Sequence, residues 1–214
     1  MIVLVVPAML PTMSNLTTST LSACALFALA TSITPGPNNT MLLASGVNFG
    51  FRRTVPHLLG VSGGLGLILL PASAGLQTLV ALNPAVHEVL RWLGSAYLLW
   101  LAWGLAHTQA SSIQTSGAAA QPMGFWAAAA FQWVNPKVWV MVLGFFSTYV
   151  PAQATVGQAM ALSLLFCLVN LPCVGSWALL GQHLRRWLAP PTRRRWFNRA
   201  MGGLLALSVL GNWV

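Results

Sequence analysis

Acidic residues are almost absent from this chain of 214 residues, which holds one Asp or Glu against ten Lys and Arg. Charged residues make up only 5% of the sequence, whereas a soluble globular domain carries about 25%. So few charges cannot cover a water-exposed surface, and the hydrophobic share of 57% supplies long apolar runs instead. Composition therefore excludes a soluble domain and predicts an integral membrane protein.

The cysteines give no sign of redox or metal chemistry. Cys24, Cys167 and Cys173 all lie inside apolar runs, and the sequence has no Cys-x-x-Cys pair. It also lacks a nucleophile triad, a phosphate-binding loop and a pair of carboxylates. We therefore expect neither an enzyme nor a bound metal or cofactor. The net charge of +9 is interpreted through membrane topology, not through nucleic-acid binding.

Long runs that are apolar on every face predict membrane-spanning helices of about 20 residues each. The sequence has room for six of them, so the expected fold is an all-α integral membrane protein. We place the helices at residues 15–34 with a continuation over 40–51, and at 55–75, 88–106, 124–150, 158–184 and 196–214.

Matching helix breakers indicate two halves of three helices each, at about residues 13–107 and 123–214. Pro136 lies 101 residues after Pro35, so a proline interrupts the first helix of each half at a corresponding position. An odd number of spans in each half turns the second half upside down relative to the first. Inverted repeats with paired helix breaks are typical of secondary transporters.

The first twelve residues, 1–12, form an apolar extension without the basic start or the cleavage site of a signal peptide. The following methionine, Met13, opens a segment that already contains a complete first helix. We therefore expect translation to begin at Met13 and residues 13–214 to form a single transporter domain.

Basic residues predict the orientation in the membrane, because they are retained on the cytoplasmic side. With six alternating helices, eight arginines fall on one side and only Arg91 on the other. The eight are Arg52, Arg53, Arg185, Arg186, Arg193, Arg194, Arg195 and Arg199. Both termini are therefore predicted to face outward from the cytoplasmic (inner) membrane.

The segment TPGPNN, at residues 34–39, interrupts the first apolar run. Pro35, Gly36 and Pro37 end a helix, and the main-chain groups that they free must be satisfied inside the membrane. The restarting helix presents N–H groups and a partial positive charge near Asn38 and Asn39, a set that suits a carboxylate. The alternative is a packed kink in which both asparagines only cap the freed backbone.

The only lysine, Lys137, lies in the middle of the fourth apolar run, directly after Asn135 and Pro136. An ionisable group at this depth is costly and is a functional candidate by default. It is expected to bind a substrate carboxylate or to contact the carbonyls that end the first half-helix, unless its stem snorkels to an interface. Gln132 and Asn135 are expected to share its polar cavity. Asn170, a further buried amide, suits a structural or a functional role equally.

Other ionisable side chains give weaker indications. Glu88 and Arg91 lie three residues apart at a helix start, which favours a surface ion pair, with proton coupling through Glu88 as the alternative. The four histidines lie near helix ends without ligand spacing, so we expect them at the membrane interface.

The motifs TPGPNNTMLLASGVNFGFRRTVPHLLG and FQWVNPK resemble those of the LysE/RhtB family of small amino-acid exporters. The resemblance runs from about Met13 to the C-terminus and implies a six-helix exporter with two inverted halves and a homodimeric assembly. The family's motif residues correspond here to residues 35–38 and 135–137.

The sequence and the resemblance together predict export of a small neutral amino acid by alternating access. The substrate carboxylate would meet the helix that restarts at Asn38, with help from Lys137, and its ammonium would meet the freed carbonyls. A cationic substrate is disfavoured because no intramembrane carboxylate is found. The alternative is a passive channel or a structural membrane protein whose kinks serve packing alone.

Overall fold

The computed structural model describes residues 17–75, 84–107, 121–150 and 153–210. Within these ranges the chain forms helices and no strands, which confirms the all-α class there. The helices are α1 (Thr18–Ile33), α2 (Pro37–Phe49), α3 (Phe51–Ala72), α5 (Pro84–His107), α7 (Phe125–Val134), α8 (Pro136–Tyr149), α9 (Val156–Trp187) and α10 (Pro191–Ser208). The predicted extension at 1–12 and the Met13 start lie outside the described residues.

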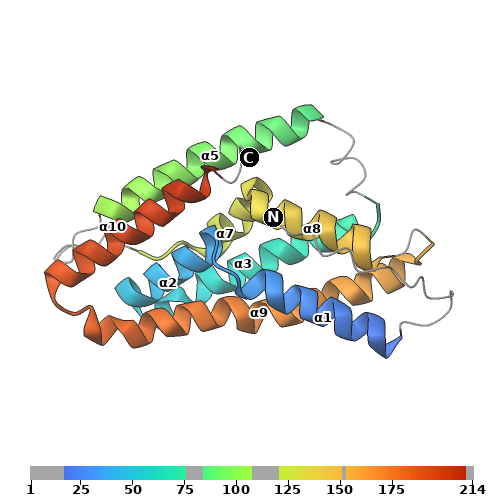
Figure 1. Cartoon of the computed structure of the whole chain (residues 1–214), viewed down its shortest axis with the longest axis horizontal. Coiled ribbons are helices and arrows are strands. Elements are labelled where there is room, and N and C mark those ends of the chain that lie inside the picture. The colour runs from blue at the N-terminus through green and yellow to red at the C-terminus, as the bar shows by residue number, and fades with distance from the viewer. Residues whose placement is uncertain (1–16, 76–83, 108–120, 151–152, 211–214) are drawn as a thin grey trace.

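The helices run back and forth along the long axis of the molecule (Figure 1). The consecutive helices α1 and α2 lead from the right of the view to the left, and α3 returns. Helix α5 leads to the left again, α7 and α8 return together, and α9 and α10 repeat the pattern. Of the described helices, α3 and α9 are long and apolar enough to cross a membrane. The α1–α2 pair, bent by 58°, is a third candidate if it counts as one broken span.

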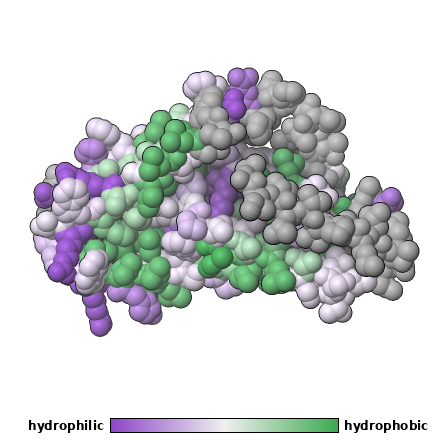
Figure 2. All heavy atoms as spheres, viewed as in Figure 1, coloured by the Kyte–Doolittle hydropathy of each residue, from purple (hydrophilic) through white to green (hydrophobic). Residues whose placement is uncertain are grey.

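Apolar side chains remain exposed on the outside of the bundle. Leu26, Trp100, Val140 and Leu168 each leave 65% or more of their surface uncovered. Figure 2 shows hydrophobic surface over the middle of the described bundle, and the largest gathering of hydrophilic atoms at the left end, where α9 and α10 meet. Such a surface suits hydrocarbon better than water, because exposed apolar area of this extent is rare on soluble monomers.

Glycines bring several helices into direct backbone contact. A Cβ atom on Gly46 of α2 would collide with the carbonyl oxygen of Ala178 on α9, and one on Gly181 of α9 would collide with the carbonyl oxygen of Leu43. The glycines on both sides of this crossing therefore allow α2 to lie against α9. Small residues serve helix association in membranes in this way, because lipid provides no hydrophobic drive between helices.

Several helices begin earlier than the sequence predicted. Helix α2 starts at Pro37 instead of residue 40, because proline fits the first helical position, where its missing N–H is not needed. Helix α3 starts at Phe51 instead of residue 55, because Gly50 adopts a φ of +83° and turns the chain at once into the next helix. This earlier start carries His57 almost two turns into α3.

Candidate functional site

The two helix breaks lie near the middle of the bundle, where α1 meets α2 and α7 meets α8 (Figure 1). Helix α1 ends at Ile33, and its last carbonyl groups have no partner within the helix. Asn39 Nδ2 donates to the carbonyl oxygens of Ser32 and Thr34, both at 2.8 Å. Trp177 Nε1 of α9 donates to the carbonyl oxygen of Ile33 at 3.2 Å. Side chains thus replace the hydrogen bonds that the first break removes.

Lys137 of α8 reaches across to the same break. Its Nζ donates to Thr34 O at 2.8 Å, to Thr34 Oγ1 at 2.9 Å and to Pro35 O at 3.3 Å. These contacts use the three hydrogens of the ammonium group. Lys137 is half-buried and lies over the C-terminal end of α1, where a cation is favoured by the helix dipole. It therefore joins the first break to the second.

Gly36 provides the space through which the lysine passes. A Cβ atom at Gly36 would lie 2.8 Å from Lys137 Cδ and 3.1 Å from Lys137 Nζ. The backbone of Gly36 is extended, with φ 175°, so its conformation makes no demand for glycine. The demand comes from the close approach of the Lys137 side chain.

Asn135 forms the second break and begins α8. Its Oδ1 accepts from the Lys137 backbone N–H at 3.2 Å, which caps the helix. Asn135 is fully buried, and its Nδ2 has no hydrogen-bond partner among the described residues. A buried amide donor without an acceptor is costly, so this atom marks a place where a further acceptor is wanted.

A reciprocal amide pair connects α2 with α7. Asn38 Nδ2 donates to Gln132 Oε1 at 2.7 Å, and Gln132 Nε2 donates to Asn38 Oδ1 at 3.2 Å. Gln132 is fully buried, and its Nε2 also donates to the Ala128 carbonyl of its own helix at 2.7 Å. The pair holds the N-terminus of α2 against the helix that precedes the second break.

Asn170 of α9 forms a third polar connection. Its Nδ2 donates to Ser32 Oγ at 3.0 Å, and its Oδ1 accepts from Ser62 Oγ at 3.0 Å. Asn170 is only 4% exposed, and these two side-chain hydrogen bonds go to α1 and α3. It therefore links α9 to two helices of the N-terminal part of the chain.

Most of the residues predicted for the site meet around one small pocket of about 20 Å³. A single water molecule needs about 10–15 Å³ of cavity volume, so the pocket has no room for an amino acid in this conformation. The predicted residues that line it are Gly36, Asn38, Asn39, Gln132, Asn135, Lys137 and Asn170. Pro35 adds the carbonyl that Lys137 contacts, and Pro37 and Pro136 start the two helices. Glu88 is exposed near the start of α5 and lines neither this pocket nor the larger one described below.

Sequence reasoning missed several participants. Ser32 and Trp177 supply contacts at the breaks, but a serine or a tryptophan in an apolar run carries no signal of its own. Thr34 belongs to the segment TPGPNN, but its contact with Lys137 is not indicated by the sequence. His57, expected with the other histidines at the membrane interface, is only 2% exposed and is packed among the helices. Its burial depends on packing between distant segments, which the sequence does not indicate.

The chain matches the family described as LysE type translocator over residues 29–210. This match defines the class of the protein as a helical membrane transporter. The chain belongs to the LysE family, whose members are translocators of the cytoplasmic membrane and not enzymes.

Curated relatives of similar length support this membership. The chain is 33% identical to a cysteine/O-acetylserine efflux protein of Escherichia coli strain K12 over 193 residues, 90% of this chain and 94% of the relative. It is 32% identical to the protein of the same description from Salmonella typhimurium over 188 residues, 87% of this chain and 92% of the relative. No solved structure shows a significant match.

Proposed function

We propose that this protein exports a small neutral amino acid from the cytoplasm by alternating access. Membership of the LysE family and relatives described as cysteine/O-acetylserine efflux proteins support the transport of an amino acid. The observation that carries the site is the buried, unpartnered Nδ2 of Asn135, placed where the two helix breaks meet. An unmet donor beside a helix N-terminus suits the carboxylate that all amino acids share.

The architecture in this proposal is six membrane spans in two inverted halves, at about residues 13–107 and 123–214. The alternating directions of the helices support it, when α1 with α2 and α7 with α8 each count as one broken span (Figure 1). The broken span then opens each half, as in transporters that bind their substrate between interrupted helices. The basic end of the bundle faces the cytoplasm in this arrangement, and the chain termini face outward. The homodimer implied by the family resemblance stays a prediction.

In the substrate complex, the carboxylate lies between the start of α2 and Asn135 Nδ2. The ammonium lies near the carbonyls of Thr34 and Pro35, which Lys137 occupies in the present conformation. Lys137 then turns from these carbonyls to the substrate carboxylate. All three hydrogens of the Lys137 ammonium are hydrogen-bonded to Thr34 and Pro35 in the present conformation. Substrate binding therefore exchanges these hydrogen bonds for contacts with the substrate.

The conformational change must open contacts between the two halves. Three of the side-chain connections between them lie around the break pocket: Asn38 with Gln132, Lys137 with Thr34 and Pro35, and Asn170 with Ser32 and Ser62. The pocket that they enclose is too small for a substrate. The structure therefore supports an assignment to a closed conformation, from which separation of the halves admits the amino acid.

The substrate class follows from charge. The chain has one acidic residue, Glu88, and it does not line the break pocket, so no side-chain anion is present there to match a second positive charge on the substrate. A short neutral side chain, as in the compounds named for the relatives, fits this site better than a lysine or arginine. Glu88 stays the coupling candidate, because it is the only carboxylate side chain of the sequence.

Replacement of Lys137 by Met tests the mechanism in proteoliposomes loaded with labelled O-acetylserine. We expect saturable efflux from the wild-type protein and its loss in Lys137→Met, because the apolar side chain cannot contact the carboxylate. Arg53→Met is the matched control, since it removes an exposed cation at the basic end of the bundle and should leave efflux unchanged.

Undiminished efflux in Lys137→Met would exclude the lysine from the mechanism. Efflux from the wild-type protein that neither saturates nor responds to competing amino acids would indicate the passive channel instead.

A further inference from the structure

A second and much larger pocket lies at the other end of α2, toward the basic end of the bundle. Its volume is about 590 Å³, and α2, α3, α5 and α10, together with residues 121–123, form its wall. This volume falls in the range of ligand-binding cavities, whereas the break pocket holds only about 20 Å³. Of these two pockets, only the larger one has room for an amino acid in this conformation.

The wall of this pocket is mostly apolar, and most of its polar groups are already engaged. Ser45 Oγ pairs with Thr54 Oγ1 at 2.8 Å. Asn48 Nδ2 donates to the Ala44 carbonyl at 2.9 Å, and His107 Nδ1 pairs with the Trp103 carbonyl at 2.8 Å. None of the described residues that line the pocket is Asp, Glu, Lys or Arg. A ligand without net charge therefore suits it better than a charged one.

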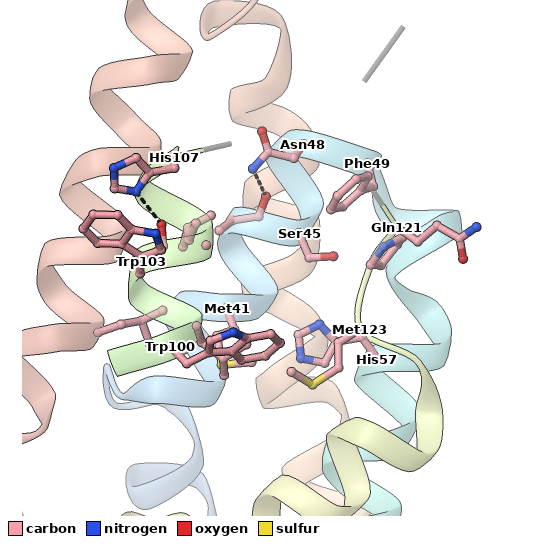
Figure 3. A pocket seen from close by; sticks show the side chains of 16 residues that line it. Met41, Ser45, Asn48, Phe49, His57, Trp100, Trp103, His107, Gln121 and Met123 are labelled. Carbon is pink, nitrogen blue, oxygen red and sulfur yellow. Dashed lines mark hydrogen bonds between the residues drawn. The ribbon is translucent and has the colours of Figure 1, made fainter. Parts of the chain in front are cut away.

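His57 is the exception among these polar groups. Its side chain is only 2% exposed, and neither Nδ1 nor Nε2 has a hydrogen-bond partner among the described residues. Figure 3 shows the His57 ring projecting from α3 into the space bordered by Met41, Trp100 and Met123. A neutral imidazole offers one donor and one acceptor, and both are unused here. A polar ligand or an ordered water would complete the hydrogen bonds of a buried histidine in this state.

We propose that this pocket is a loading site, where the exported amino acid binds before it reaches the helix breaks. His57 donates to the carboxylate of the zwitterion, and the indole of Trp100, which lines the same pocket, accepts its ammonium. The short side chain packs against the apolar wall at Met41 and Met123. This inference rests on the proposed export function and adds a second position for the same substrate.

Helix α2 connects the two positions. Met41 lines the large pocket, and Asn38 lines the break pocket one turn earlier on the same helix. Three residues of helix span about 4.5 Å along its axis, so the substrate has a short distance to move. The unbranched Met41 side chain, which lines the larger pocket on the side toward Asn38, can change rotamer easily.

Protection of a reporter cysteine from alkylation tests the loading site. The native cysteines are replaced by alanine, Met123→Cys is introduced in the pocket, and N-ethylmaleimide labelling is followed with increasing O-acetyl-L-serine. We expect the ligand to slow labelling of Cys at this position but not of a second reporter, Ala189→Cys, between α9 and α10. Adding His57→Leu should raise the half-protecting concentration at least tenfold, and His183→Leu, an exposed histidine of α9, should leave it unchanged.

Two further readouts separate a binding role of His57 from a structural one. His57→Leu removes two unpartnered polar atoms from a buried position, so its thermal unfolding temperature should equal or exceed that of the parent. His57→Asn keeps a donor and an acceptor and should restore part of the protection. A lower unfolding temperature in His57→Leu together with full loss of protection in His57→Asn would overturn the binding role.

Efflux from proteoliposomes is measured in parallel with the same proteins. Efflux without protection at Met123→Cys would overturn the loading site and leave the proposed export intact. Protection that depends on His57 but without efflux would support the pocket as an amino-acid site and overturn export. Protection and efflux that both decline in His57→Leu are the expected result.

Discussion

At the scale of single residues, the helix breaks are built by side chains that take over main-chain hydrogen bonds. Asn39, Lys137 and Trp177 supply donors to the last carbonyls of α1, which lipid could not satisfy. These residues come from three different helices. A break in a membrane span is therefore stable here only as part of the folded bundle.

Asn135 provides a test of the binding site that leaves the helix cap in place. Asn135→Asp keeps the oxygen that accepts from the Lys137 N–H, but it replaces the unpartnered amide donor by a second oxygen. A substrate carboxylate then loses a hydrogen bond worth about 1.5–3 kcal/mol, which corresponds to a rise in KM of roughly tenfold or more. The KM of efflux from proteoliposomes measures this change.

Gln158→Glu is the matched control for this substitution. Gln158 is half-buried at the start of α9, where its Oε1 accepts from the Thr155 N–H, a role that a carboxylate also fills. An unchanged KM in Asn135→Asp would show that the amide of this residue does not touch the substrate.

At the scale of helices, close crossings depend on glycine and set the position of α2. Gly46 and Gly181 face each other across the α2–α9 crossing, and each lies against a carbonyl oxygen of the partner helix. Helix α2 begins at one pocket and ends beside the other, so its packing against α9 fixes the geometry of both.

Gly46→Ala should therefore separate α2 from α9 and destabilise the protein by about 1–3 kcal/mol, the usual effect of an added methyl group in a tightly packed site. Gly203→Ala on α10 is the matched control. A Cβ atom there has no neighbour within 4 Å, so the higher helix propensity of alanine should stabilise the protein slightly or leave it unchanged. Thermal unfolding of both variants in detergent measures the difference, and equal stability would exclude a tight crossing.

The helix breaks could be predicted from the sequence, but the partners of the freed groups could not. Two prolines around a glycine, and a proline before the only lysine, mark both breaks by local rules alone. The amide pair between Asn38 and Gln132 joins residues 94 positions apart, and no local rule selects one glutamine over another. In the same way, the contacts of Trp177 and Ser32 follow from how the helices pack against one another, and not from the local sequence.

Local rules also failed where the chain turns tightly. The sequence placed the start of α3 at residue 55 because Arg52 and Arg53 resemble a cytoplasmic loop. In the structure a single glycine, Gly50, makes the turn, and both arginines fall in the first turn of α3. His57 is buried by elements that pack around α3 from distant parts of the sequence, and no local rule indicates this packing, so the larger pocket was not anticipated.

At the scale of the whole molecule, the charge distribution predicts the orientation in the membrane. Arginines gather where α9 meets α10 and where α2 meets α3, and a Cβ atom on Gly50 would lie 2.9 Å from Arg185 Nη1. These two connections therefore lie side by side at one end of the bundle. Basic residues at one end favour retention of that end in the cytoplasm.

Two exposed alanines at opposite ends give a matched pair for testing this orientation. Ala189 lies between α9 and α10 at the basic end, and Ala74 follows α3 at the other end. In a cysteine-free background, Ala74→Cys should react with a membrane-impermeant maleimide in intact cells. Ala189→Cys should react only after the membrane is permeabilised, and the reverse pattern would invert the topology.

The narrowness of the break pocket has a consequence for the cell as a whole. A space that admits about one water molecule cannot hold the continuous file of waters along which protons and small cations leak. With Lys137 seated on the carbonyls of Thr34 and Pro35, the resting protein should act as an electrical insulator. A cell can then keep many idle copies in its membrane without dissipating the ion gradients on which its energy supply depends.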